Sequence, residues 1–330
     1  MAVETELSFT VGDLASMRFA VSPMWELGPS LRLLASGRAH PVHRPWVEQV
    51  RPRLAAVGPL RGWLTEIVPP AGYVPDFVNP APAGPAPTLA EELAAIRATP
   101  AERVRRDLDR LREYGDGLGP RLRALYADPP AGLARLTEAF EAYWKVALAP
   151  YWARVRAALD ADVLHRARQV AEHGAARVLN DLHAEVRWSR DTLRLERRPK
   201  PLDRRTSGAG LLLIPSAFTG PGPLMRVAPP DPPQLAYPAR GIGSLWAARP
   251  AAPNAALAAV LGRSRALLLV ELDAPASTTD LARRTGLSPA AVSQYLTALR
   301  DAHLVSAHRA GRSVLYARTA SAEAVLAPLT

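Results

Sequence analysis

Residues 277–299 read STTDLARRTGLSPAAVSQYLTAL, and this stretch decides the fold of the C-terminal part of the chain. Ser277 and Asp280 have the spacing of a capping box, in which each side chain bonds the other residue's backbone N–H, so a helix is predicted to start here. Gly286 is predicted to end that helix, because glycine adopts the left-handed backbone of a helix C-terminus without strain. Ser288 then caps a following helix. The stretch therefore predicts two short helices joined by a tight turn.

The second of these helices has one apolar and one polar face. Val292, Leu296 and Leu299 lie at i, i+4 and i+7 and are predicted to face the core. The opposite face carries small or hydrogen-bonding side chains, which permit close approach to the major groove and can bond base edges or phosphates. The candidate DNA-binding residues in and around this helix are Ser288, Pro289, Ala290, Ser293, Gln294, Tyr295, Thr297 and Arg300.

Two strand-like segments, 304–309 and 313–318, follow this helix and surround a glycine that suits a hairpin turn. Arg309, Arg312 and Ser313 then lie at the tip, where arginine meets phosphate or the minor groove. On the N-terminal side, residues 255–272 predict one further helix with a wide apolar face, which includes Val260 and Leu268. A helix, two capped helices and a hairpin, in this order, predict a winged helix-turn-helix.

The same residues resemble the ArsR/SmtB family of winged-helix repressors. The resemblance rests on residues 279–282, 286–299, 303–305 and 311–316. It implies a homodimer that binds an inverted repeat in double-stranded DNA and releases it when an effector binds, with Ser293, Gln294 and Tyr295 in the major groove. The family's metal-sensing cysteines are absent, so sensing of metalloids through thiolates is excluded.

The first ~245 residues predict a mainly helical domain with a small antiparallel β-sheet. Long helices are expected at 133–148 and 151–182, strands at 192–197, 210–215 and 234–238, and a loop at 218–233 that is rich in Pro and Gly. We expect two domains, 1–246 and 254–330. Pro215–Phe218 and Tyr237–Gly241 resemble, more loosely, the extended ArsR-like regulators of actinobacteria, in which an uncharacterised domain precedes the winged helix.

The N-terminal domain is predicted to sense a small molecule and to dimerise. An apolar pocket between helices, or at the junction of helices and sheet, is the expected ligand site. Four aromatic residues cluster around Pro150, where a helix breaks, and are the candidate ligand-binding residues: Tyr143, Trp144, Tyr151 and Trp152. Ordinary core packing is the alternative role for each of them.

Composition excludes several classes of protein. The net charge of +10 fits a polyanionic partner such as DNA. With no cysteine, the chain has no disulfide and no thiolate metal site. No apolar run is long enough for a membrane span and no signal peptide is evident, so a cytoplasmic location is expected. His40 and His43 lie near Glu48 without clear third and fourth ligands, so neither a metal nor a cofactor is expected.

The sequence therefore predicts an effector-responsive transcriptional regulator, most simply a repressor, and not an enzyme. The chain contains no P-loop, no G-x-S-x-G and no H-E-x-x-H motif. Two alternatives remain: an architectural DNA-binding protein without a ligand, and a co-regulator that uses its winged helix for protein contacts.

Overall fold

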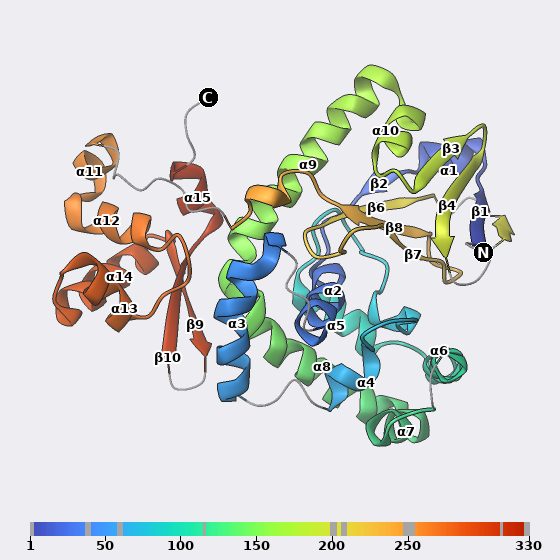
Figure 1. Cartoon of the computed structure of the whole chain (residues 1–330), viewed down its shortest axis with the longest axis horizontal. Coiled ribbons are helices and arrows are strands. Elements are labelled where there is room, and N and C mark those ends of the chain that lie inside the picture. Colours follow the sequence, from blue (N-terminus) through green and yellow to red (C-terminus); the bar gives the residue numbers. More distant parts are fainter. Residues whose placement is uncertain are drawn as a thin grey trace. The chain divides into compact units, whose positions relative to one another are not determined.

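The computed structural model describes residues 3–36, 41–57, 62–114, 117–198, 203–205, 210–246, 255–310 and 313–326. By internal contacts the chain divides into two compact units (Figure 1). Unit 1 comprises 1–38, 62–139 and 159–242, and unit 2 comprises 39–61, 140–158 and 243–330. The two domains expected from the sequence, 1–246 and 254–330, remain a prediction.

Unit 1 is helical with two small sheets. Its helices are α1 (Val11–Ala15), α2 (Pro23–Ala35), α4 (Trp63–Ile67), α5 (Leu89–Arg97), α6 (Ala101–Glu113), α7 (Pro120–Ala127), the larger part of α8 (Pro129–Ala147), the later part of α9 (Trp152–His173), α10 (Ala175–Asp181) and the short η2 (Asp76–Val78). Its strands are β1 (Val3–Ser8), β2 (Arg18–Phe19), β3 (Val186–Ser189), β4 (Thr192–Arg198), β5 (Asp203–Arg205), β6 (Leu212–Ser216), β7 (Leu224–Arg226) and β8 (Gln234–Pro238).

The mainly helical fold class is confirmed, but the predicted single antiparallel sheet is wrong in its detail. Within the described residues there are two four-stranded sheets in unit 1, with the orders β3-β4-β1-β5 and β2-β6-β8-β7. Both are mixed, since β1 runs parallel to β5 and β6 runs parallel to both β2 and β8. Parallel neighbours need long crossovers, so their pairing is set by the tertiary fold and not by local pattern.

Three predicted boundaries are also wrong. The helix expected at 151–182 breaks at Gly174, whose φ of 81° separates α9 from α10. The helix expected at 255–272 breaks at Gly262, whose φ is 82°. The loop expected at 218–233 contains β7, which pairs antiparallel with β8. In the first two cases the residues on both sides of the glycine favour a helix. The local sequence therefore does not indicate that the glycine has a positive φ and ends the helix.

Unit 2 contains the C-terminal helices and hairpin together with pieces from earlier in the chain. The early pieces are η1 (Pro41–His43), α3 (Arg44–Val57), the end of α8, η3 (Ala149–Tyr151) and the start of α9. The C-terminal elements are η4 (Ile242–Ser244), α11 (Ala255–Leu261), α12 (Arg263–Glu271), α13 (Thr278–Thr285), α14 (Pro289–Asp301), β9 (Val305–Ala310), β10 (Ser313–Arg318) and α15 (Ala320–Leu326).

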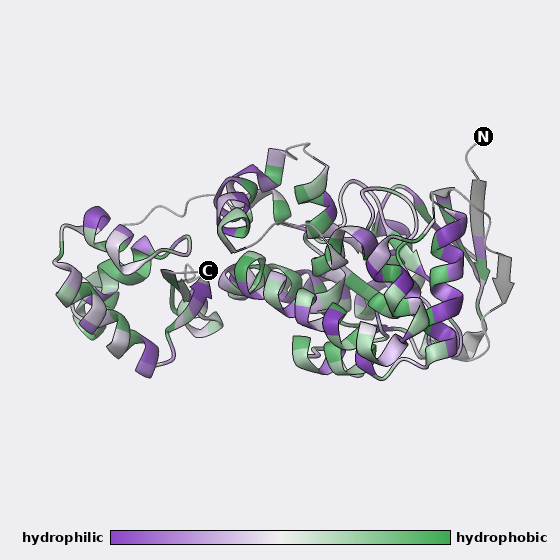
Figure 2. Cartoon of the chain, turned by 90° about the horizontal axis from the view of Figure 1, so that it is seen from below, coloured by the Kyte–Doolittle hydropathy of each residue, from purple (hydrophilic) through white to green (hydrophobic). Residues whose placement is uncertain are grey.

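Apolar burial forms the core of each unit. Hydrophilic and hydrophobic residues alternate along the helices, as is typical of amphipathic helices (Figure 2). In unit 1 one core cluster joins the sheet strands to α10, and in unit 2 a separate cluster joins α12, α13, α14, β9 and α15. Among the described residues, no helix has both the length and the apolar character that a membrane span requires.

Candidate nucleic-acid interface

The turn between α13 and α14 is built from local capping interactions. Ser277 Oγ accepts from the backbone N–H of Asp280 at 3.2 Å, and the backbone N–H of Ser277 donates to Asp280 Oδ2 at 3.4 Å, which completes the predicted capping box. The hydrogen bond from Ser277 holds the pKa of Asp280 below its usual value. Gly286 has a φ of 71° and ends α13, and its N–H donates to the carbonyl of Ala282 at 3.0 Å.

Helix α14 begins as the sequence predicted. Ser288 Oγ accepts from the N–H of Ala291 at 3.2 Å, and Pro289 occupies the first turn. Val292 and Leu296 are fully buried and Leu299 is nearly so, and all three belong to the winged-helix core cluster. These contacts fix which face of α14 points outward.

The outward face carries most of the predicted DNA-binding residues. Those that are exposed on or before α14 are Ser288, Pro289, Ala290, Ser293, Gln294, Thr297 and Arg300. The Thr297 hydroxyl donates to the carbonyl of Ser293 at 3.0 Å, so its oxygen keeps lone pairs for an incoming donor. A helix face of small residues, hydroxyls and one amide has the chemistry that reads base edges.

Tyr295 lies differently from the other predicted residues of this helix. Its ring is half-buried against the core cluster, and the guanidinium of Arg265 lies 5.4 Å from the ring centroid. The cation–π contact joins α12 to α14. Tyr295 therefore supports the orientation of α14 while its ring stays partly accessible.

The predicted hairpin forms, and its register places Arg309 opposite Val314 and Val305 opposite Arg318. Arg309 is exposed near the turn. Arg312 lies outside the described residues, and of Ser313 only the backbone, in β10, is described. His308 is half-buried on β9, where Nε2 and the hydroxyl of Ser306 lie 2.7 Å apart, and burial lowers its pKa. We refer to this hairpin as the wing.

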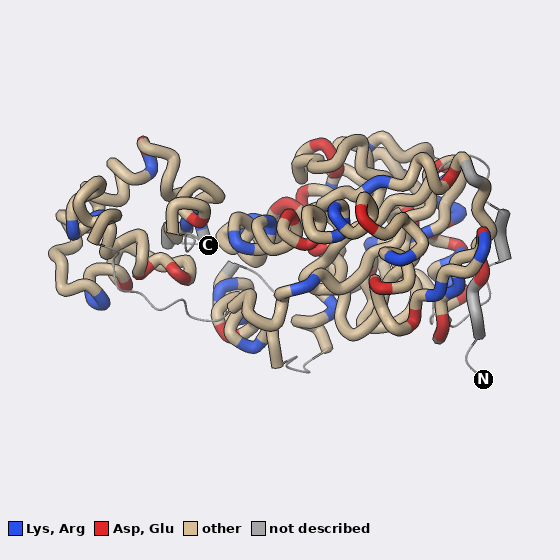
Figure 3. The backbone as a smooth tube through the Cα atoms, turned by 90° about the horizontal axis from the view of Figure 1, so that it is seen from above, with Lys and Arg blue, Asp and Glu red and all other residues tan. Residues whose placement is uncertain are grey.

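Two exposed arginines at the end of α13 are not among the predicted DNA-binding residues. Arg283 is 3.3 Å from Asp280, and Arg284 donates to the carbonyl of Glu271 at 3.5 Å. The sequence feature that indicates them is the pair of consecutive arginines two residues before Gly286. Residues 254–330 contain eight arginines against five carboxylates. Basic and acidic positions are interspersed along the described backbone in Figure 3.

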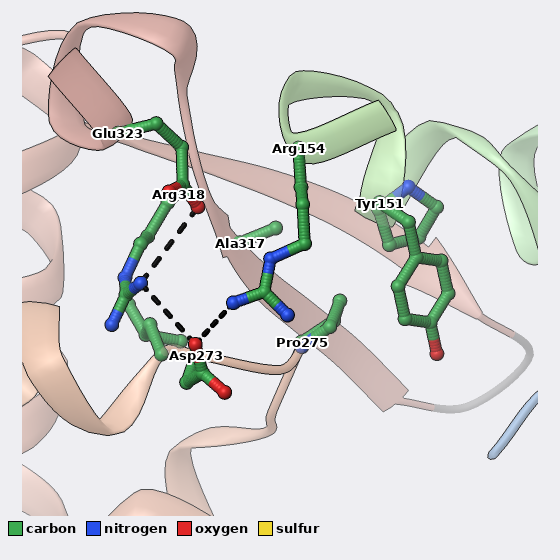
Figure 4. Close-up of a pocket in the computed structure, with 9 residues that line it drawn as sticks. Tyr151, Arg154, Asp273, Pro275, Ala317, Arg318 and Glu323 are labelled. Carbon is green, nitrogen blue, oxygen red and sulfur yellow. Dashed lines mark hydrogen bonds and ion pairs between the residues drawn. The ribbon is translucent and has the colours of Figure 1, made fainter. Parts of the chain in front are cut away.

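The predicted ligand residues are mostly buried. Tyr143 and Tyr151 are 2% and 4% exposed, and Trp144 packs edge-on against Trp152 with ring centroids 5.0 Å apart. Of the four, only Tyr151 lines the pocket shown in Figure 4. Their role as ligand contacts stays a prediction. Within the described part of the chain, no three His, Asp or Glu side chains come together as a metal site, and His40 lies outside it.

Comparison with known protein families agrees with this geometry. Residues 262–307, from α12 to the start of β9, match the family described as bacterial regulatory protein, arsR family. The C-terminal part is an ArsR-family helix-turn-helix. It is preceded by a match of residues 98–243 to a family of unknown function, DUF5937. No curated protein and no solved structure matches the chain. The chain thus combines an ArsR-family helix-turn-helix with a large N-terminal part, which is consistent with an ArsR-like regulator.

The two sequence motifs of that N-terminal part surround buried carboxylates. The N–H groups of Ala217 and Phe218 donate to the carboxylate of Glu26 at 2.9–3.1 Å. The Tyr237 hydroxyl and the Arg240 N–H donate to Asp162 at 2.8 and 3.1 Å. Both motifs therefore span the ends of β6 and β8 and form hydrogen bonds within unit 1.

Proposed function

We propose that this protein is a site-specific DNA-binding transcriptional regulator that acts as a homodimer on an inverted repeat. The observation that carries the proposal is the outward face of α14, which presents Ser293, Gln294 and Thr297 from a helix held by a buried apolar face. In this proposal each α14 of a dimer enters the major groove of one half-site. In the same proposal the exposed Arg309, together with Arg312, contacts the DNA backbone beside it.

We further propose that the regulator responds to a small-molecule effector and represses its target in the absence of that effector. The support is the size of the N-terminal part and the class of helix-turn-helix that follows it. The chain then acts in the cytoplasm through binding and not through catalysis. Effector and DNA affinities are linked, so an effector that lowers DNA affinity is itself bound more weakly by the DNA complex.

A gel shift tests the proposal. The purified protein is mixed with its own upstream intergenic DNA at 50 and 200 mM salt, with specific or scrambled competitor. We expect a complex that scrambled DNA does not displace and that weakens steeply with salt. Binding that scrambled DNA removes completely would contradict a site-specific regulator and favour an architectural role, and absence of binding would favour a co-regulator with protein contacts.

A further inference from the structure

The outer face of the wing is buried, although a two-stranded hairpin normally leaves that face in water. Side chains alternate along a strand, so Tyr316, which packs on the winged-helix core, points away from its neighbours Leu315 and Ala317. Leu315 and Ala317 are nevertheless only 5% and 3% exposed, and neither belongs to that core cluster. Another part of unit 2 must therefore cover them.

The cover includes an early segment of the chain, η3. Element η3 contacts both β9 and β10, and Pro150 and Tyr151 line a small pocket together with Ala317. Figure 4 shows Tyr151 and Arg154 beside Ala317 and Pro275. We name residues 44–57 and 149–154, which are α3, η3 and the first turn of α9, the brace.

Arg53 ties the brace to the loop before α13. Its Nη1 donates to the Tyr151 hydroxyl oxygen at 2.8 Å and its Nη2 donates to the carbonyl of Pro275 at 3.1 Å. The Tyr151 hydroxyl in turn donates to Gln49 Oε1 at 3.1 Å. Burial raises the pKa of Tyr151 to about 12, so the hydroxyl stays a donor at neutral pH.

Arg154 makes the second tie, through a charge cluster. It forms an ion pair with Asp273, which also lies 3.5 Å from Nη1 of the buried Arg318 (Figure 4). Arg318 lies 3.7 Å from Glu323 and donates to the carbonyls at the end of α12. Two cations thus face two carboxylates. Since Arg318 keeps Asp273 and Glu323 when the brace is removed, the winged helix retains its own ion pairs without Arg154.

The braced loop connects directly to the DNA interface. Ala276 exchanges two backbone hydrogen bonds with Tyr316 of β10, at 3.1 and 2.9 Å, and the next residue is the cap of α13. The loop 273–276 therefore joins the wing to the start of the helix-turn-helix.

We propose that Arg53 and Arg154 are positioning residues for DNA binding: they hold the brace against the outer face of the wing and so fix the wing for its contacts with DNA. A hairpin of two strands is marginal without packing. Without the brace, Leu315 and Ala317 meet water and the wing loses order, which weakens its contribution to affinity. Both segments of the brace are flanked in the sequence by segments of unit 1. A change in unit 1 could therefore alter the brace and, through it, the affinity for DNA. This inference rests on the proposed function.

Hydrogen exchange of the full chain without DNA is the first test. The variant is Arg53→Ala/Arg154→Ala, and its control is Arg168→Ala/Arg187→Ala, which removes the same charge from two exposed positions in unit 1. We expect exchange of the β9 and β10 amides to rise about tenfold in the variant, with α13 and α14 still protected. Wing exchange equal to that of the control would overturn the proposal. If α13 and α14 also lose protection, the milder Arg154→Gln replaces the double variant and the same criterion applies.

A double-mutant cycle with Arg309→Ala is the second test, by gel shift. We expect the brace variant to bind the operator roughly 5–20-fold more weakly than the control does. Arg309→Ala should then weaken the brace variant by a much smaller factor than it weakens the wild type. Strictly multiplicative effects would overturn the proposal, because the wing would then be independent of the brace. A wild type that binds no DNA sequence specifically would contradict the proposed function, while the exchange test still decides whether the brace orders the wing.

Discussion

Some side chains of α14 stabilise the winged helix, and others are candidates for DNA recognition. Leu296 is fully buried in the winged-helix core, whereas Gln294, two positions earlier, is exposed. The helical period of 3.6 residues places them on opposite faces, so the sequence alone separates the two groups. Ser288 and Ser277 illustrate the same point for caps, because their hydrogen bonds run to residues three positions away.

Gln294→Ala is expected to reduce sequence discrimination more than general affinity. A side-chain amide that bonds a base edge is worth about 1–3 kcal/mol against the wrong base. Competition gel shifts with operator and single-base mutants should show that the variant accepts at least one mutant site nearly as well as the operator. Arg312→Ala, in contrast, should weaken all sequences about equally. If both variants bind like the wild type, α14 and the wing do not dock as proposed.

Leu296→Ala is expected to destabilise the winged helix by about 2–5 kcal/mol, because the side chain is fully buried and its removal leaves a cavity. Chemical denaturation, monitored by the hydrogen exchange of the α14 amides, measures this loss of stability. Ala298→Ser, at an exposed position of the same helix, is the control and should change stability by less than about 0.5 kcal/mol. Equal effects of the two substitutions would contradict the assigned core face.

At the scale of elements, local signals were sufficient for α13 and α14 and insufficient elsewhere. The predicted helix at 278–285 coincides with α13, because its capping box and its glycine end are both local. The strand pairs β1–β5 and β6–β8 and the cover on the wing join distant segments, and no local pattern encodes them. Val260 was predicted to be buried on the first helix but is 82% exposed, since Gly262 ends α11 and redirects the chain. The exposed face of α14 could be predicted, whereas the brace could not.

Gly286→Ala is expected to destabilise the helix-turn-helix by about 1–2 kcal/mol, because an L side chain is strained at a φ of 71°. No atom lies within 4 Å of the Cβ that alanine would add, so backbone strain is the whole cost. Gly243→Ala is a matched control in unit 2, where φ is not in the left-handed range and the added Cβ also meets open space. Thermal unfolding of both variants separates strain from the general effect of removing a glycine.

At the scale of the whole molecule, buried carboxyl groups make stability depend on pH. Burial raises the pKa of Glu26 from 4.5 to about 8, although hydrogen bonds from Ala217, Ser216 and Phe218 favour its charged form. Burial likewise raises the pKa of Glu92 to about 7. A folded state that holds these protons more tightly than the unfolded state loses stability as pH rises from about 4.5 to about 8.

Glu26→Gln is therefore expected to flatten the fall in stability of unit 1 between pH 5 and 8. The neutral amide keeps the size of the side chain and has no proton to lose. Denaturation midpoints at several pH values, with the exposed Glu138→Gln as control, measure the difference in slope. An unchanged slope in Glu26→Gln would show that Glu26 is not the titrating group.

The brace is synthesised well before the loop and the wing that it contacts. Arg53 and the carbonyl of Pro275 that it bonds are 222 residues apart. At roughly 5–20 residues per second, a ribosome adds that distance in about 10–45 s. During this interval α3 and then η3 are made, while the strands that η3 contacts do not yet exist. The nascent protein must therefore keep an apolar surface out of wrong associations until its last segment emerges.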